Sequence, residues 1–236
     1  MRPAPDQPRY NPGTALLAWV GAFTVGVFGS AIVLAATGYS GTTAADQLPL
    51  WVLAVTQLPA WLGLIGAAVA VSRLFGTGHV RDDFGLRARL VDLWGLPIGV
   101  VVQLVFVPIL YAALRGFGLD TSALNKPAKA LTDRAADRIG LVLVVLIVVV
   151  GAPIVEELFF RGLVLRSIAA RYSDWLAITG SAVLFALIHF QLLQFPGLAL
   201  FGVVVGYCAH RTRRLGMGIL AHASFNATTV IVLLRR

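Results

Sequence analysis

The sequence predicts an all-α protein, a polytopic transmembrane helical bundle of about seven spans. Its 236 residues are 58% hydrophobic and only 13% charged, whereas about a quarter of the residues of a soluble domain are charged. The apolar residues form continuous blocks, and several are long enough for the roughly 20 helical residues that cross a hydrocarbon core. Continuous rather than alternating blocks favour helices over a β-barrel. We therefore expect six to eight membrane spans.

The first three apolar blocks are bounded by polar, arginine-containing segments. The first, Ala15–Thr37, follows a polar, proline-rich start and is itself of full span length, so no cleavable signal peptide is expected. The second block, Leu48–Ser72, stops before Arg73. The third block, Val91–Leu114, stops before Arg115. Basic residues at the ends of apolar blocks are typical of membrane spans.

Four further blocks follow Gly116–Asp137, the longest polar connection, which is expected to carry a surface helix. These blocks are Ile139–Leu165, Trp175–Phe190, Phe195–Ala209 and Met217–Leu234. The last three are short, so we expect them to be tilted, broken or partly re-entrant. Gly202 and Gly206 are four residues apart and predict that another helix packs closely against their span.

The distribution of charge predicts orientation and environment. The net charge of +8 arises from basic residues that flank the apolar blocks, so the bilayer and its anionic headgroups are the expected partner and nucleic acid is not. A bias of arginine toward one side predicts a cytoplasmic N-terminus and an outside C-terminus, in a cell membrane of prokaryotic character. The arginines assigned to the cytoplasmic side are Arg2, Arg9, Arg73, Arg81, Arg87, Arg89, Arg161, Arg166, Arg171, Arg211, Arg213 and Arg214.

The two glutamates of the chain, Glu156 and Glu157, are adjacent and end its most apolar run. Ionisable side chains at membrane depth are costly and indicate function. On a helix, Glu157 and Arg161 are four residues apart and can pair, whereas Glu156 points about 100° away and is left to act as a general base. Pro153 frees a carbonyl and can kink the helix there. The alternative is a charge cluster solvated at the bilayer edge.

Two histidines supply further polar groups after residue 180. His189 follows Phe185 by four residues in an apolar segment, where the alternative is a hydrogen-bonded structural histidine. His222 and Asn226 share one helix face, so their N–H groups can converge to stabilise an oxyanion. Interhelical hydrogen bonding is the alternative for that pair. Together the three elements offer a base, electrophilic groups and an orienting ion pair, as a hydrolytic site requires. Cys208, the single cysteine, permits neither an internal disulfide nor a cysteine-based zinc cluster.

The three motifs resemble those of the CPBP family, the CAAX prenyl endopeptidases and bacteriocin-processing (Abi-type) enzymes, which are intramembrane proteases related to the Ras-converting endopeptidase. That family carries EExxxR, FxxxH and HxxxN motifs on successive helices. All three are present in order, at Glu156 to Arg161, at Phe185 to His189 and at His222 to Asn226. The resemblance covers residues 138–233, which we expect to form a catalytic core of about four helices. Residues 1–137 would supply about three spans and a polar loop of the same membrane domain.

The resemblance implies a role for each motif residue. Glu156 and His189 would activate water, and His222 with Asn226 would form the oxyanion hole. Glu157 and Arg161 would form the supporting ion pair, and Phe185 would pack beside the cavity. The site would lie inside the bundle. Under the expected topology His189 falls toward the far side of its short helix, so that helix must tilt, start deeper or be broken for the site to assemble.

The cofactor and the substrate are less sharply predicted. Members of the family are also described as metalloproteases, and Glu156, His189 and His222 are the alternative zinc ligands. The soluble His-Glu-x-x-His signature is absent, and no cofactor is favoured. The expected partner is a peptide or protein substrate at the membrane, lipidated or not. Two other functions are carried forward: a transporter or proton-relay protein, and a non-catalytic bacteriocin-immunity or scaffold protein. No matching polar site in the first half supports the inverted repeats of a transporter.

Overall fold

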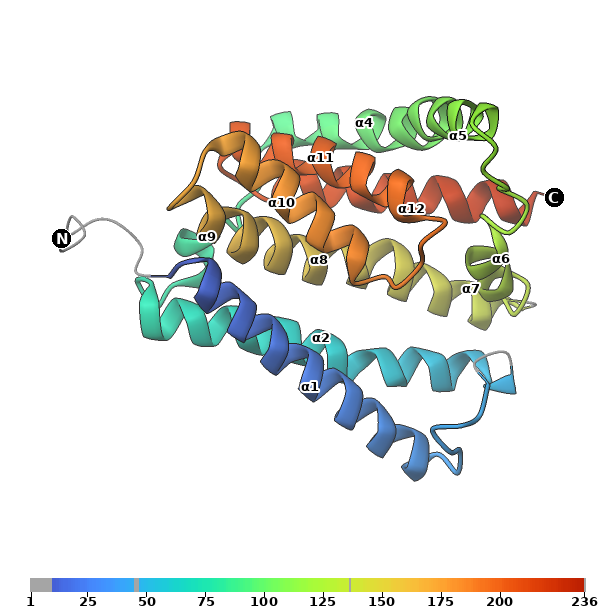
Figure 1. The fold of residues 1–236 in the computed structure, drawn as a ribbon. Helices are drawn as coiled ribbons and strands as arrows, with labels where there is room; N and C mark the ends of the chain where they lie inside the picture. Colours follow the sequence, from blue (N-terminus) through green and yellow to red (C-terminus); the bar gives the residue numbers. More distant parts are fainter. Residues whose placement is uncertain (1–9, 45–46, 136, 236) are drawn as a thin grey trace.

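The computed structural model describes residues 10–44, 47–135 and 137–235, and in them the chain forms helices and no strands. Arg2, Arg9 and Arg236 lie outside these residues, so the structure does not describe part of the charge bias. Two long helices begin the bundle, α1 (Pro12–Ala36) and α2 (Leu50–Phe75). They form an antiparallel pair at one side of the molecule (Figure 1). A short helix, α3 (Val80–Asp83), follows.

Each of the next two apolar blocks is one continuous helical rod that contains π-helical segments. The rod Leu90–Gly116 has a 3₁₀ start at Leu90–Trp94, then α4 (Gly95–Val101), a π segment at Val102–Phe106 and α5 (Val107–Gly116). The polar connection holds the surface helix that was expected, α6 (Lys126–Thr132). The rod Arg138–Ala169 comprises α7 (Arg138–Val144), a π segment at Val145–Gly151, α8 (Ala152–Glu157), a π segment at Leu158–Val164 and α9 (Leu165–Ala169).

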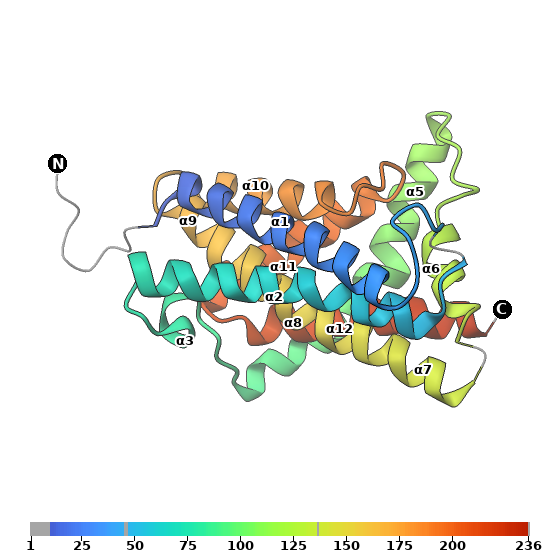
Figure 2. The same cartoon turned by 90° about the horizontal axis from the view of Figure 1, so that it is seen from below.

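Three helices complete the fold: α10 (Asp174–Leu187), α11 (Phe195–Thr212) and α12 (Gly216–Leu234). Among the described residues, five helices are long and apolar enough to cross a membrane, and neither the 14-residue α10 nor the 18-residue α11 is among them. All seven expected segments are nevertheless present as helices that run alternately between the two ends of the bundle (Figures 1 and 2). The polytopic helical bundle is therefore confirmed, and its orientation in the membrane stays a prediction.

Apolar side chains on the outside of the bundle show what surrounds it. Leu17, Phe28 and Leu62 are among many large apolar residues that are more than half exposed. In water such a surface would be unfavourable, but lipid solvates it. The protein is a multi-pass membrane protein on these grounds.

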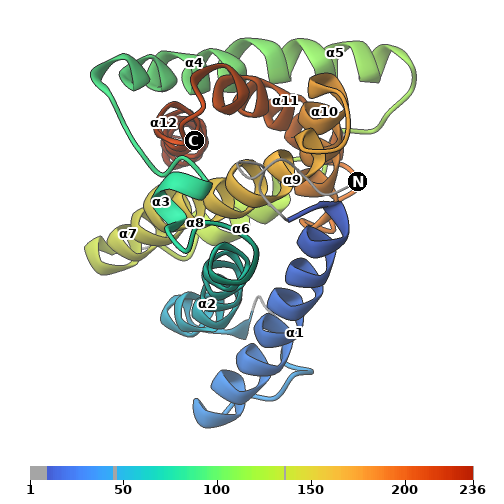
Figure 3. The ribbon, with the colours of Figure 1, turned by 90° about the vertical axis from the view of Figure 1, so that its left-hand side faces the viewer.

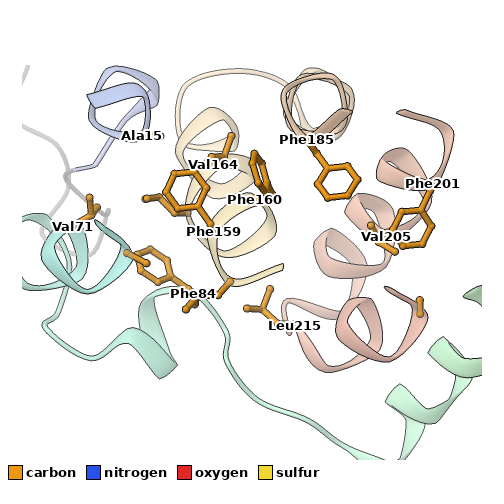
Figure 4. Packing of buried hydrophobic residues seen from close by; sticks show 14 of the residues in the cluster. Ala15, Val71, Phe84, Phe159, Phe160, Val164, Phe185, Phe201, Val205 and Leu215 are labelled. Carbon is orange, nitrogen blue, oxygen red and sulfur yellow. The ribbon is translucent and has the colours of Figure 1, made fainter. Parts of the chain in front are cut away.

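The interior is held by aromatic packing around the middle of the Arg138–Ala169 rod. Phe159 and Phe160, which lie between the two glutamates and Gly162, are almost completely buried. Figure 4 shows Phe160 facing Phe185 of α10, and their ring centroids are 5.6 Å apart. Phe185 and Phe201 of α11 extend the same cluster. The polar motif is therefore embedded in a cluster of buried apolar side chains.

Small residues allow the helices to approach closely. An added Cβ at Gly202 would lie 2.9 Å from Ala182 Cβ, so this glycine is what permits the contact between α10 and α11. On α4, Gly95 and Gly99 play the same part against α12, where an added Cβ at Gly99 would overlap the carbonyl oxygen of Ala221. Sequence reasoning found the first pair and missed the second.

Gly99→Ala should lower the thermal stability of the protein, because its methyl group would push α4 away from α12. Overpacking of this kind costs about 1–3 kcal/mol. Gly66→Ala on α2 is the matched control, since nothing lies within 4 Å of its added Cβ and alanine is the better helix former. Thermal unfolding of both variants in detergent checks this, and equal melting temperatures would contradict the assigned contact.

Candidate active site

The Glu157–Arg161 pair is buried at the centre of the site. The two side chains are four residues apart along the rod, and Arg161 Nη1 donates to Glu157 Oε1 over 3.0 Å. Glu157 is 0% exposed and Arg161 is 1% exposed. The pair expected from the spacing is therefore present, and it is screened from solvent. A buried charge that loses its partner is strongly destabilising, so each of these two residues requires the other.

Arg161 is also held by two groups on other helices. Its Nη2 donates to the carbonyl oxygen of Gly202 on α11 over 3.2 Å. Its guanidinium carbon lies 4.4 Å from the ring centroid of Phe185 on α10, a cation–π arrangement. The arginine consequently joins three helices around one carboxylate. Phe185 was expected to pack beside the site, and it is fully buried there.

His222 of α12 joins the same carboxylate. Its Nδ1 lies 3.0 Å from Glu157 Oε1, and the histidine is 4% exposed. Because an ionised carboxylate can only accept, Nδ1 carries the hydrogen in this bond. The rings of Phe185 and Phe201 lie edge-on to the imidazole, with centroids 5.6 Å and 5.0 Å away. The orientation of His222 is thus fixed by Glu157 and two aromatic rings.

Glu156 differs from its neighbour in exposure and in partners. Its side chain is 16% exposed, and its Oε2 lies 3.9 Å from Nε2 of His222. Among the described residues it makes no shorter polar contact with a side chain. The adjacent glutamates therefore have separate surroundings: Glu157 is enclosed by Arg161 and His222, and Glu156 faces the second nitrogen of the same histidine.

His189 lies in the turn that follows α10, because that helix already ends at Leu187. Its Nδ1 contacts the carbonyl oxygen of Phe185 over 2.7 Å, so Nδ1 is the donor and Nε2 keeps a lone pair in the neutral ring. Its ring centroid is 4.9 Å from that of Phe185. Within the described part of the chain, no hydrogen bond or ion pair joins His189 to either glutamate. The expected direct Glu156–His189 partnership is not seen in this arrangement.

Asn226 of α12 donates from Nδ2 to the carbonyl oxygen of Val148 over 2.7 Å. Val148 lies in the π segment at Val145–Gly151, in which a carbonyl pairs with the N–H five residues later. That position is Pro153, which has no N–H. The proline therefore leaves an acceptor available, as the sequence suggested, and Asn226 is its donor. An amide nitrogen carries two hydrogens, so one stays available to a ligand.

The zinc alternative finds no support in the geometry. Among residues 10–44, 47–135 and 137–235, no group of three or more His, Cys, Asp or Glu side chains could hold a metal ion. Glu156, His189 and His222 are thus not brought together as a ligand set. The absence of a cofactor stays a prediction.

Sequence reasoning missed two residues that shape the site. Gly218 leaves room for the carboxylate, because an added Cβ there would lie 3.0 Å from Glu157 Oε2. Tyr111 of α5 tethers the segment that follows His189: its hydroxyl donates to the carbonyl oxygen of Leu193 over 2.6 Å and accepts from the backbone N–H of Gly197 over 3.3 Å. The one sequence signal for Tyr111 is its hydroxyl group, which stands in the largely apolar block Val91–Leu114.

Glu157→Gln should destabilise the protein, whereas Glu156→Gln should not. The first change leaves Arg161 buried without its anion, which typically costs about 3–5 kcal/mol. The second removes a charge from a partly exposed side chain. Thermal unfolding of both variants in one detergent measures the difference, and equal losses would contradict the separate surroundings assigned to the two acids.

Tyr111→Phe should loosen the segment that follows His189 by removing its two hydrogen bonds. The N–H of Gly197 is buried, and leaving such a group unsatisfied costs about 1–3 kcal/mol. Hydrogen–deuterium exchange over residues 188–198 should rise in this variant. Tyr207→Phe on α11 is the control, since Tyr207 is half-exposed and its hydroxyl makes no hydrogen bond in the described structure. Faster exchange in both variants would argue against the tether.

Comparison with known proteins places these observations in a family context. A family model described as type II CAAX prenyl endopeptidase Rce1-like matches residues 138–228. An uncharacterized 24.3 kDa protein of Escherichia coli is 33% identical over 151 residues, which are 58% of this chain and 69% of that protein. The UPF0177 protein YbdI of Lactococcus lactis subsp. lactis (strain IL1403) is 36% identical over 161 residues, which are 65% of this chain and 81% of that protein. No solved structure matches the chain.

Proposed function

Because the chain belongs to the Rce1-like family of type II CAAX prenyl endopeptidases, we propose that it is an intramembrane endopeptidase that hydrolyses a peptide bond close to the membrane. One observation carries the residue assignment. Of two adjacent glutamates, Glu157 is enclosed by Arg161 and His222, and Glu156 is the partly exposed one that faces His222 Nε2. The exposed carboxylate can meet a substrate, and the enclosed one can hold the site in shape.

Glu156 acts as the general base in this proposal. Its carboxylate takes a proton from a water molecule, the water oxygen attacks the carbonyl carbon of the scissile bond, and the proton is passed to the leaving nitrogen. General-base assistance of this kind contributes about 10²–10⁴-fold to a rate. His189 assists the same water, because its Nδ1 is committed to Phe185 and its Nε2 can accept a hydrogen bond.

His222 and Asn226 stabilise the oxyanion that forms on the substrate. With Nδ1 donating to Glu157, Nε2 of His222 can donate only when the ring is doubly protonated. A protonated ring balances the local charge, since Glu156 and Glu157 carry two negative charges and Arg161 one positive. The second Nδ2 hydrogen of Asn226 is the other donor, and the bond to Val148 fixes the direction of its amide. Donors held in advance are what makes such stabilisation effective.

The substrate we propose is a membrane-associated protein or peptide, and the description of the family makes a C-terminally prenylated peptide the first one to test. The site lies among helices within the bundle, so a substrate must reach it from the membrane or from the end of the bundle. The lipid bilayer is the other partner, and the location we propose is the cell membrane with a cytoplasmic N-terminus.

Glu156→Gln should lower kcat/KM for a farnesylated CAAX peptide by about 10²–10⁴-fold, with the melting temperature unchanged. His189→Ala should also lower activity, because it removes the second acceptor for the water. The control is Asp120→Asn, an exposed acid in a loop after α5. Cleavage is followed with a quenched fluorescent peptide in detergent or liposomes.

Full activity of the Glu156→Gln variant would rule out Glu156 as the base. If wild-type protein leaves the prenylated peptide intact, the same variant serves as a trap: proteins that co-purify with Glu156→Gln and not with wild type are the candidate substrates, and each is then tested for cleavage by wild type.

A further inference from the structure

A hollow of about 470 Å³ opens at one end of the bundle, apart from the glutamate site. Arginines dominate its lining. The charged residues around it are Arg81, Asp82, Arg87, Arg89, Arg213 and Arg214. With five arginines and one aspartate, the lining of the hollow is strongly positive. None of these residues has a role in the proposed hydrolysis.

Two chain segments that are far apart in sequence build the hollow and are fixed to each other. The backbone N–H of Leu215 donates to the carbonyl oxygen of Gly85 over 2.9 Å. The backbone N–H of Gly216 donates to the carbonyl oxygen of Arg87 over 3.2 Å. Arg214 donates two hydrogen bonds to the carboxylate of Asp92, from Nη2 to Oδ1 over 2.8 Å and from Nε to Oδ2 over 3.2 Å. Asp92 is fully buried. The loop after α3 and the turn before α12 therefore form one wall rather than two loose loops.

Much of the positive charge in the hollow has no internal partner. Arg87 pairs with Asp82, and Arg214 pairs with Asp92. Arg81, Arg89 and Arg213 have no carboxylate within ion-pair distance in the described parts of the chain, and all three side chains are exposed. Three arginines without an ion-pair partner in the described structure therefore line one concave surface. The orientation of a membrane protein depends on basic residues in its cytoplasmic loops. That rule does not explain why these arginines surround a hollow.

The position of the hollow indicates which anion it meets. Its lining residues lie between helices that could cross the membrane: α2 ends at Phe75, the next rod begins at Leu90, and α12 begins at Gly216. Figure 3 looks along the bundle onto this end, at which α3 lies in the foreground. Residues just outside the spans lie at the level of the lipid headgroups.

We propose that this hollow binds the phosphate group of an anionic membrane lipid. Guanidinium groups present paired donors that match phosphate oxygens. In the predicted orientation the hollow lies at the cytoplasmic leaflet, which carries the anionic lipids. Bound lipid would join the α3 loop to the α12 turn, and α12 carries His222 and Asn226. The lipid therefore stabilises the end of the helix from which the active site is built.

The test compares two triple variants of the full chain that remove the same charge. In the first, Arg81, Arg89 and Arg213 are each changed to Gln. In the control, Arg73, Arg171 and Arg211, exposed arginines of the same end that do not line the hollow, are changed to Gln. Proteins are purified from detergent with equal phosphatidylglycerol and phosphatidylcholine, and native mass spectrometry counts the retained lipid. Wild type and control should retain phosphatidylglycerol selectively, and affinity should fall about fivefold for each arginine removed from the hollow.

Equal phosphatidylglycerol retention in both triple variants would overturn the proposal. If the first triple variant fails to fold, Arg89→Gln and Arg213→Gln are measured singly against Arg171→Gln. A second arm identifies the source of the phosphate: inorganic phosphate is titrated in lipid-free detergent and the melting temperature is followed. Stabilisation by phosphatidylglycerol alone supports a lipid headgroup, and equal stabilisation by inorganic phosphate that depends on the same arginines would overturn the lipid as ligand.

Discussion

The buried carboxylate of Glu157 is the interaction on which the rest of the site depends. It accepts from Arg161 on its own rod and from His222 on α12, and the arginine in turn reaches Gly202 on α11. Charges in an apolar interior are tolerated only with partners. The helices that supply those partners are therefore held in one relative arrangement. The phenylalanines packed around them stabilise the same arrangement.

The hydrogen bonds of Glu157 give the two adjacent glutamates different surroundings. Because Glu157 occupies Arg161 and one nitrogen of His222, neither the cation nor that nitrogen is available to Glu156. The remaining nitrogen of His222 faces Glu156 at 3.9 Å. A partly exposed carboxylate, an oriented imidazole and an amide fixed by Val148 are then arranged along two facing helices, and this arrangement is the one on which the proposed peptide hydrolysis rests.

Sequence reasoning predicted the bundle, its helical segments and the Glu157–Arg161 pair, because hydropathy and i, i+4 spacing are local properties. It did not predict that His222 would pair with Glu157, that Asn226 would donate to Val148 or that Tyr111 would tether the segment beyond His189. Those contacts join residues 65 or more positions apart. The exact end of α10 at Leu187 also escaped prediction, since Ile188, His189 and Phe190 follow it without a proline or glycine. The placement of His189 in a turn follows from tertiary packing rather than from any local signal.

The most direct test of the account is a double-mutant cycle between Glu157 and Arg161, measured as unfolding free energy in detergent. The single variants Glu157→Gln and Arg161→Met each leave one charge without its partner, and the double variant leaves neither. We predict that the double variant is more stable than the sum of the single losses by at least about 1 kcal/mol. Peptide cleavage should stay low in the double variant, because His222 has lost the anionic partner that favours its protonated ring. Additive losses would show that the two side chains are not coupled, and would contradict the role assigned to the buried pair.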